Sequence, residues 1–306
     1  MIWALLILTA IFAIPLVNEY NRRVMDDTAR GSAPGQFAVL SKGVTHYEWH
    51  GPVRGKIAVC VHGLTTPSFV WRGMTRSLAL MGFRVLTYDL YGRGYSDRPK
   101  GTQDTDFFLT QLNELLAHEE VDGDITLIGY SMGGAICTCY AAANHNRIRQ
   151  LVLLAPAGLG VVSGRMGNFI AKTRFIGDWL MLALYPHAYR KGLRSERNIS
   201  TSVPDIGVLQ AGELDFKRFV PSVLASIRGF LSRVLTDEHK ALHRHGIPVL
   251  AIWGENDKVI PQTAIGALAQ VSRDAHQEVI DGAGHGLPYT HTDQIIAIFQ
   301  EALIRD

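Results

Sequence analysis

The sequence has little cysteine, little excess charge and no internal repeats. Its 306 residues include three cysteines, Cys60, Cys137 and Cys139, whose spacing matches no disulfide framework or metal-binding motif, so we expect buried free thiols. The net charge is only +2, and no stripe of Lys and Arg with interleaved aromatic residues is present, which argues against a nucleic-acid partner. Because 47% of the residues are hydrophobic, the chain can bury a large core and is not a disordered protein.

Charged side chains are absent from the first 18 residues. The run MIWALLILTAIFAIPLV would be about 25 Å long as a helix, at the short end of what a membrane span needs. Arg22 and Arg23 follow the run and no clear cleavage site is present, so we predict an uncleaved anchor over residues 1–18 and a linker over residues 19–35. The positive-inside rule then places the main domain in the cytoplasm. The alternatives are an exported protein and an apolar arm that packs on the protein or on a partner.

Residues 36–156 and 246–306 alternate between strand-like and helix-like patterns. Two strand-like runs, QFAVLS and THYEWH, are followed by six stronger ones: KIAVCVH, RVLTYDL, DITLIGY, QLVLLAP, PVLAIWG and HQEVID. Most are apolar on both faces, as parallel strands covered by helices are. The alternation predicts a mostly parallel, doubly wound α/β sheet. Residues 157–245 carry helical patterns and no convincing strand, so we expect an inserted helical cap there.

The pentapeptide from Gly129 to Gly133 places Ser131 between the strand-like run DITLI and an Ala-rich helical pattern. In this context G-x-S-x-G presents a catalytic serine on a sharp strand-to-helix turn. Small residues on both sides of a strained turn keep the strand and the helix from colliding, and Gly134 gives further room. We therefore predict that Ser131 is a nucleophile rather than a polar residue of a flexible loop.

A serine nucleophile needs a base, and the base needs an acid that orients it. Asp257 follows the run PVLAIWG, and His285 follows the last strand-like run. Since parallel strands open their carboxyl ends on one edge of a sheet, we expect Ser131, Asp257 and His285 to converge there. Glu255, earlier in the same loop, is the nearest rival for the acid, and Asp281 is a weaker one.

An acyl-transfer enzyme also needs hydrogen-bond donors for the negative charge that develops on the substrate oxygen. The sequence VCVHGLTT places His62 at the end of a strand, and the backbone amides of Leu64 and Met132 are the expected donors. His62 itself is expected to be a structural hydrogen-bonding residue. The loop YDLYGRGYSDRP, which follows the next strand, is also expected to be structural.

Five motifs in this order, VHGL, YDLYGRGYSD, GYSMGGA, GENDKVIP and GAGHG, resemble the α/β-hydrolase fold superfamily in its esterase and lipase-like branch. The resemblance covers residues 36–306, and it implies an eight-stranded core sheet with a helical cap, hydrolysis without a cofactor, and a serine acyl-enzyme. Two of the motifs are also similar to those of monoacylglycerol-lipase-like members, although Tyr130 stands where these often have His. Dehalogenases and epoxide hydrolases of this fold use an aspartate at the position of Ser131, which argues against both activities.

Aromatic and Met side chains are dense in the predicted cap. Phe169, Phe175, Trp179 and Met181, with Tyr130 beside the nucleophile, either line an acyl pocket or, in the case of the cap residues, pack the cap onto the core. We therefore expect a serine esterase that acts on small-molecule esters with an apolar acyl group. The alternatives are another Ser-His-Asp activity, such as a carbon–carbon bond hydrolase, a thioesterase or a lactonase, and a non-enzymatic membrane scaffold.

Two further groups of cap residues lie outside these motifs. The excess of basic residues, Arg190 and Arg194 among them, suits either anionic headgroups beside the anchor or a solvent-exposed face. His239, His243 and His245 include an i, i+4 pair that would suit a metal on a helix. No nearby Cys or acidic pattern completes such a site, so neither a metal nor a cofactor is expected.

Overall fold

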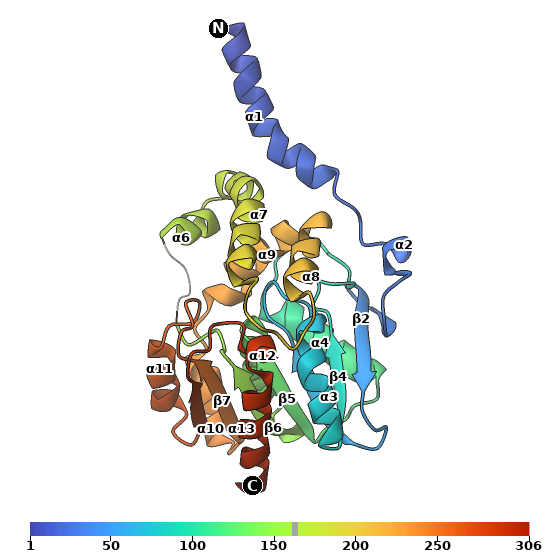
Figure 1. Ribbon diagram of the computed structural model, residues 1–306, viewed down its shortest axis with the longest axis vertical. Helices are drawn as coiled ribbons and strands as arrows, with labels where there is room; N and C mark the ends of the chain where they lie inside the picture. Colours follow the sequence, from blue (N-terminus) through green and yellow to red (C-terminus); the bar gives the residue numbers. More distant parts are fainter. Residues whose placement is uncertain (161–164, 306) are drawn as a thin grey trace.

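A computed structural model describes residues 1–160 and 165–305 of the chain, without the side chains of residues 4–8, 165 and 305. Its centre is one sheet, in the order β1-β2-β4-β3-β5-β6-β7-β8 (Figure 1). The strands are β1 (Gln36–Leu40), β2 (Gly43–His50), β3 (Lys56–Val61), β4 (Phe83–Tyr88), β5 (Ile125–Tyr130), β6 (Ile148–Leu154), β7 (Val249–Gly254) and β8 (His276–Ile280). β2 is antiparallel to both β1 and β4, and all other neighbours are parallel. The predicted mostly parallel, doubly wound sheet is therefore confirmed.

Helices cover both faces of this sheet (Figure 1). The helices of the core are α3 (Arg72–Leu80), α4 (Thr105–His118), α5 (Met132–Ala143), α10 (Thr236–Arg244), α11 (Thr263–Val271), α12 (Leu287–Thr290) and α13 (Thr292–Arg305). Short 3-10 helices lie at Ser68–Trp71, His145–Arg147, Glu213–Asp215 and Phe230–Ser232. α3 packs with α12 and α13, whereas α4, α5, α10 and α11 form the other layer. The sequence placed α10 in the cap, but this helix packs on α5 and α11 and belongs to the core.

Burial on both faces explains the composition of the central strands. Every residue of β5 and of β7 is buried, as expected for parallel strands between two helical layers. The three cysteines are free and buried, as predicted. The carboxyl ends of the parallel strands point toward the cap (Figure 1). The loops that leave the parallel strands at that edge therefore lie on the side of the sheet that carries the cap.

The cap consists of α6 (Arg165–Lys172), α7 (Ile176–Glu196), α8 (Ile206–Gly212) and α9 (Phe219–Arg228). It has a small apolar cluster of its own, which Met181 of α7 shares with Phe219 and Val223 of α9. Leu64, from the loop after β3, packs against this cluster and also against the main core. The loop after β3 is thus held between the core and the cap.

Helix α1 (Ile2–Tyr20) projects from the body next to α7 (Figure 1). The rings of Phe12 and Trp179 stack with 5.3 Å between their centroids, and the Trp179 indole donates a 2.8 Å hydrogen bond to the Phe12 carbonyl. Among the described side chains, which exclude those of residues 4–8, no single helix is long and apolar enough to cross a membrane. One bent pair of helical segments, residues 219–232 and 236–244, has the length and the composition of a membrane span, and only these two properties support it.

The segment that was predicted as a linker, residues 19–35, is bound to the domain. It contains α2 (Asp27–Arg30) and joins the cap through a parallel bridge at Arg23. Arg30 is buried, and its guanidinium makes a 2.5 Å ion pair with Asp97 in the loop after β4. Residues 19–35, called the strap below, therefore connect the end of α1 to the cap and to the core.

Candidate active site

Ser131 forms the turn between β5 and α5 by itself. Its backbone has φ 53° and ψ −117°, a conformation that residues other than Gly rarely adopt. The Ser131 amide donates to the Leu154 carbonyl of β6 (2.9 Å), and the Ser131 carbonyl accepts from the Ala157 amide (3.0 Å). Bonds on both sides of the peptide thus hold the strained turn in place.

Glycines allow the backbone to pack closely around this turn. A Cβ atom on Gly129 would lie 2.5 Å from the Cα atom of Gly134, so the strand and the helix could not approach as they do. A Cβ atom on Gly133 would lie 2.0 Å from the Val61 carbonyl oxygen of β3. The spacing of the G-x-S-x-G motif is therefore a steric requirement of the turn.

The three predicted catalytic side chains meet above the sheet edge. The Ser131 hydroxyl lies 3.1 Å from His285 Nε2, and His285 Nδ1 lies 2.8 Å from Asp257 Oδ2. Asp257 is in the loop after β7 and His285 in the loop after β8, so two crossovers bring together groups that are up to 154 residues apart. Glu255, the rival acid, instead accepts a hydrogen bond from the Gly282 amide at 2.8 Å.

The environment of Asp257 keeps this carboxylate ionised. Its side chain is almost fully buried, and burial alone would raise its pKa. The His285 hydrogen bond and charge, with the amides of Ile260 and Val259 that donate to Oδ1 at 2.9 and 2.7 Å, outweigh burial and lower the pKa of Asp257. An ionised Asp257 orients the His285 ring and stabilises its protonated form.

Two backbone amides beside Ser131 are free to act as oxyanion donors. A Cβ atom on Gly63 would lie 3.3 Å from Ser131 Cβ, so the loop after β3 passes next to the nucleophile. The amide of Met132 is at the first residue of α5, where an N–H has no partner within the helix. Within the described part of the chain, neither this amide nor that of Leu64 donates a hydrogen bond.

His62 links the loop after β3 (residues 62–67), called the oxyanion loop below, to the loop after β4. Its Nε2 atom accepts a 2.9 Å hydrogen bond from the Leu90 amide, so the ring proton lies on Nδ1, which donates to the Gly63 carbonyl at 2.8 Å. Burial lowers the pKa of His62 to about 4, and the ring is neutral. This arrangement corresponds to the structural role expected for His62.

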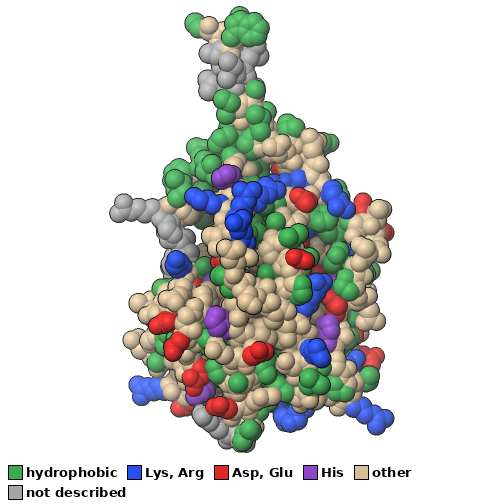
Figure 2. Space-filling view, viewed as in Figure 1, with side chains coloured by type: hydrophobic (Ala, Val, Ile, Leu, Met, Phe, Trp, Pro, Cys, Tyr) green, Lys and Arg blue, Asp and Glu red, His purple; other side chains and the backbone are tan. Residues whose placement is uncertain are grey.

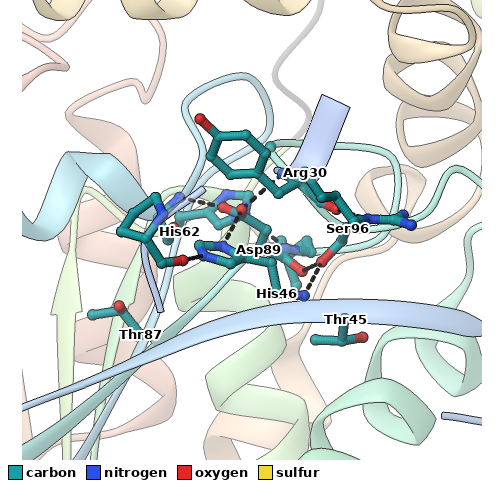
Figure 3. Close-up of polar contacts among 12 residues, drawn as sticks. Arg30, Thr45, His46, His62, Thr87, Asp89 and Ser96 are labelled. Carbon is teal, nitrogen blue, oxygen red and sulfur yellow. Dashed lines mark hydrogen bonds and ion pairs between the residues drawn. The ribbon is translucent and has the colours of Figure 1, made fainter. Parts of the chain in front are cut away.

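Asp89 is the centre of a buried polar network behind that loop (Figure 3). Its carboxylate accepts from His46 Nδ1 at 2.7 Å and from the Ser68 amide at 2.8 Å. His46 Nε2 faces the Pro34 carbonyl at 2.6 Å, so both ring nitrogens face acceptors and the ring is an imidazolium. Burial opposes both charges, but their contact raises the pKa of His46 and lowers that of Asp89. The hydrogen bonds of this buried network hold the loop YDLYGRGYSDRP in place.

Arg93 of the same loop is fully buried and touches the oxyanion loop directly. Its Nε atom donates to the Leu64 carbonyl at 2.9 Å, and Nη1 donates to the Tyr91 carbonyl and to Gln103, both at 2.8 Å. Its Nη2 atom donates to the Ser226 hydroxyl of α9 at 2.7 Å. Burial lowers the pKa of Arg93 to about 9, so the guanidinium keeps its charge at neutral pH. One side chain thus joins the Leu64 peptide to the cap.

Cap residues make two further bonds to the oxyanion loop. The Tyr189 hydroxyl of α7 donates to the Thr65 carbonyl at 2.9 Å, and the Gln210 amide of α8 donates to the Thr66 hydroxyl at 2.8 Å. Arg93, Tyr189 and Gln210 were not among the residues predicted from the sequence. A charged residue between two glycines was a visible signal for Arg93, whereas nothing in the sequence pairs the two cap residues with that loop.

Comparison with known proteins assigns the chain to a family. A family model described as the alpha/beta hydrolase fold matches residues 58–292. The chain belongs to the α/β-hydrolase family. A non-heme chloroperoxidase of Kitasatospora aureofaciens is 25% identical over 256 residues, which are 79% of this chain and 89% of that protein.

Solved structures of the same fold superpose on most of the chain. The enol-lactonase of Burkholderia xenovorans has a TM-score of 0.74 at 19% identity, covering 88% of this chain and all of that one. A thermophilic esterase of Thermogutta terrifontis has a TM-score of 0.71 at 22% identity, with coverages of 89% and 99%. At these identities the superpositions support the fold alone.

The predicted pocket residues of this α/β-hydrolase lie in different places. The Tyr130 ring is buried and packs on His285, with 5.2 Å between the ring centroids. Met181 is buried inside the cap and lines a cavity of about 330 Å³ between α7, α9 and the loop after β4, where no triad residue takes part. Trp179 stacks on α1, and Phe169 and Phe175 are exposed. Only Tyr130 therefore touches the triad among these five residues.

The described residues of the α/β-hydrolase contain no group of three or more His, Cys, Asp or Glu side chains arranged to hold a metal. His239 is fully buried in α10, where burial lowers its pKa to about 4. His243 pairs with Asp274 at 3.1 Å, and His245 stacks on His145. His239, His243 and His245 thus have three separate environments.

The Gly133→Ala variant should lose stability because its new methyl group would meet the Val61 carbonyl. We expect a loss of about 1–3 kcal/mol in the free energy of unfolding, measured by urea denaturation. Gly266→Ala is the matched control, since Gly266 is also helical and a Cβ atom there meets nothing within 4 Å. The control should be neutral or gain up to about 1 kcal/mol. Equal stability of the two variants would contradict the steric argument.

The Arg93→Lys variant should label Ser131 more slowly with a fluorophosphonate probe. A lysine cannot hold the Leu64 peptide and the cap together, and a misplaced oxyanion donor costs about 10- to 100-fold in rate. Arg147→Lys is the control, because Arg147 also binds backbone carbonyls, at Val121 and Asp122, but lies away from the site. It should lose stability and keep its labelling rate. Equal labelling rates for the two variants would show that Arg93 has only a structural role.

Proposed function

We propose that this α/β-hydrolase is a serine esterase that cleaves carboxylic esters with an apolar acyl group through an acyl-enzyme. The observation that carries the proposal is the continuous chain of contacts from the Ser131 hydroxyl through His285 to Asp257, at 3.1 and 2.8 Å. A serine, a histidine and an aspartate in this geometry form the constellation used for acyl transfer. The free amides of Leu64 and Met132 supply the remaining requirement.

The reaction follows from these positions. His285 Nε2 accepts the Ser131 proton as Oγ attacks the ester carbonyl carbon, and the amides of Leu64 and Met132 donate to the oxyanion that forms. The intermediate collapses, His285 gives its proton to the leaving alkoxide, and the acyl group stays on Ser131. His285 then takes a proton from a water molecule, which attacks the acyl carbon. The acid leaves, and Ser131 regains its proton from His285.

The apolar surroundings of the nucleophile support an apolar acyl group. Ser131 is only 8% exposed, and its neighbours Tyr130 and Leu64 present apolar surface. Leu64 also packs against the apolar cluster of the cap, which lies over this edge of the sheet. An acyl chain in this region would bury apolar surface.

The Ser131→Ala variant and a substrate series test the proposal together. We expect the variant to lose p-nitrophenyl ester hydrolysis by about 10³-fold or more, while the exposed-site control Ser41→Ala keeps it. For the native chain, kcat/KM should rise with acyl length over the first members of the series and exceed the values for matched thioesters and lactones. A Ser131→Ala protein with full activity would refute the assignment. Higher kcat/KM for thioesters or lactones would move the proposal to another Ser-His-Asp activity.

We further propose that residues 1–18 anchor the protein in a membrane with the catalytic domain on the cytoplasmic side. The support is the apolar run itself and the basic pair Arg22 and Arg23 that follows it. Membrane fractionation without detergent should recover the full-length chain in the membrane, and protease should reach the domain only when the cytoplasmic side is accessible. Recovery of the full-length chain in the soluble fraction would contradict this proposal.

A further inference from the structure

An open cavity lies where α1 meets the cap. It has a volume of about 810 Å³. Residues from the end of α1, from α7 and from the 3-10 helix Glu213–Asp215 line it. This size is ample for a polar headgroup. None of the triad residues lines it, so it is separate from the catalytic site.

The lining of this cavity is strongly basic. Five Lys or Arg side chains face it, Arg22, Arg23, Arg190, Lys191 and Arg194, against a single acid, Asp215. Of the five, only Arg22 has an ion pair with a carboxylate in the described part of the chain. Four unpaired cations around one cavity repel each other and favour an anionic occupant.

Apolar side chains surround the base of α1 next to these cations. Phe175 is 85% exposed, and Phe169 and Ile176 are also exposed on α6 and α7. Several apolar side chains of α1, among them Ile14 and Val17, are exposed as well. Figure 2 shows the hydrophobic side chains around the base of the projecting helix, with a band of Lys and Arg directly below them. A protein bound at the surface of a bilayer has the same order of side chains: apolar side chains contact the acyl chains, and basic side chains lie at the level of the phosphates.

Contacts on both sides hold the cavity in shape. The Arg218 amide donates to the Glu19 carboxylate at 2.6 Å, and the Lys217 ammonium donates to the Tyr20 carbonyl at 3.0 Å. Farther along α1, Phe12 stacks on Trp179. These contacts join α1 to α7 and to residues 217–218, on both sides of the cavity.

We propose that this cavity binds the phosphate headgroup of an anionic membrane lipid and so seats the cap on the bilayer surface. The guanidinium groups of Arg190 and Arg194 are suited to bidentate contacts with phosphate oxygens. A merely solubilising face would spread its charges, whereas these cations converge on one cavity beside an apolar rim. The inference goes beyond ester hydrolysis and beyond anchoring, because it assigns lipid selectivity to named side chains.

Energy transfer to tracer lipids tests this site in the full-length protein. The chain is reconstituted in phosphatidylcholine vesicles that contain a trace of phosphatidylglycerol or of phosphatidylcholine, each with the same dansyl group on its acyl chain. Trp3 and Trp179, on and beside α1, act as donors. We expect greater transfer to the phosphatidylglycerol tracer, and a preference that weakens as salt is added.

The variant R190Q/K191Q/R194Q should lose that preference, by roughly fivefold in relative lipid association for each charge removed. The control K240Q/R244Q/R273Q also removes three exposed cations, two on α10 and one just after α11, in the core. It should behave like the native chain. Circular dichroism and fluorophosphonate labelling of Ser131 verify that both variants are folded.

Each outcome decides the inference. A preference lost in the cavity variant and kept in the control supports it. Equal transfer to both tracers in the native chain, a preference that survives in the cavity variant, or an equal loss in the control would overturn it. Transfer to neither tracer would refute the anchor as well, while the assignment of ester hydrolysis to Ser131 is tested separately and does not depend on these results.

Discussion

The strained backbone of Ser131 is the constraint on which the rest of the site depends. A residue with φ 53° can end β5 and start α5 without an intervening loop, which leaves its hydroxyl at the sheet edge where His285 arrives from β8. The strain persists because β6 and the segment after it bind both sides of the Ser131 peptide. The same turn places the Met132 amide at a helix start, beside the reacting group. Nucleophile, oxyanion donor and helix thus follow from one backbone conformation.

The oxyanion loop couples the catalytic edge to the cap. Its carbonyl groups are bound by Arg93 from the loop after β4 and by Tyr189 from α7. Because Arg93 also binds Ser226 of α9, a shift of the cap would move the Leu64 peptide and change the donor geometry. The cap is in turn bound to α1 and to the strap that follows it. Binding of the amino-terminal helix to a membrane would therefore also affect the position of the cap.

Much of this architecture could be predicted from the sequence, because parallel strands and the G-x-S-x-G turn each require a recognisable local pattern of residues. Apolar runs at regular spacing locate the strands, and the glycines around Ser131 reflect contacts that a Cβ atom would break. The cap residues could not be placed in the same way. Trp179 looks like a pocket residue in the sequence, but its partner is Phe12, 167 residues away, and aromatic density alone does not name a partner. Arg93 likewise looks like a single charge in a Gly-rich loop, because two of its acceptors, Leu64 and Ser226, are 29 and 133 residues away in the sequence.

The central claim is that Ser131 carries the acyl group during turnover. The most direct measurement is rapid-quench mass spectrometry after the full-length protein is mixed with a short-chain p-nitrophenyl ester. Our account predicts that the peptide containing Ser131 gains the mass of the acyl group within the first turnover and loses it as the acid is released. Turnover of the ester with no acyl group on that peptide, or with the acyl group on another residue, would contradict it.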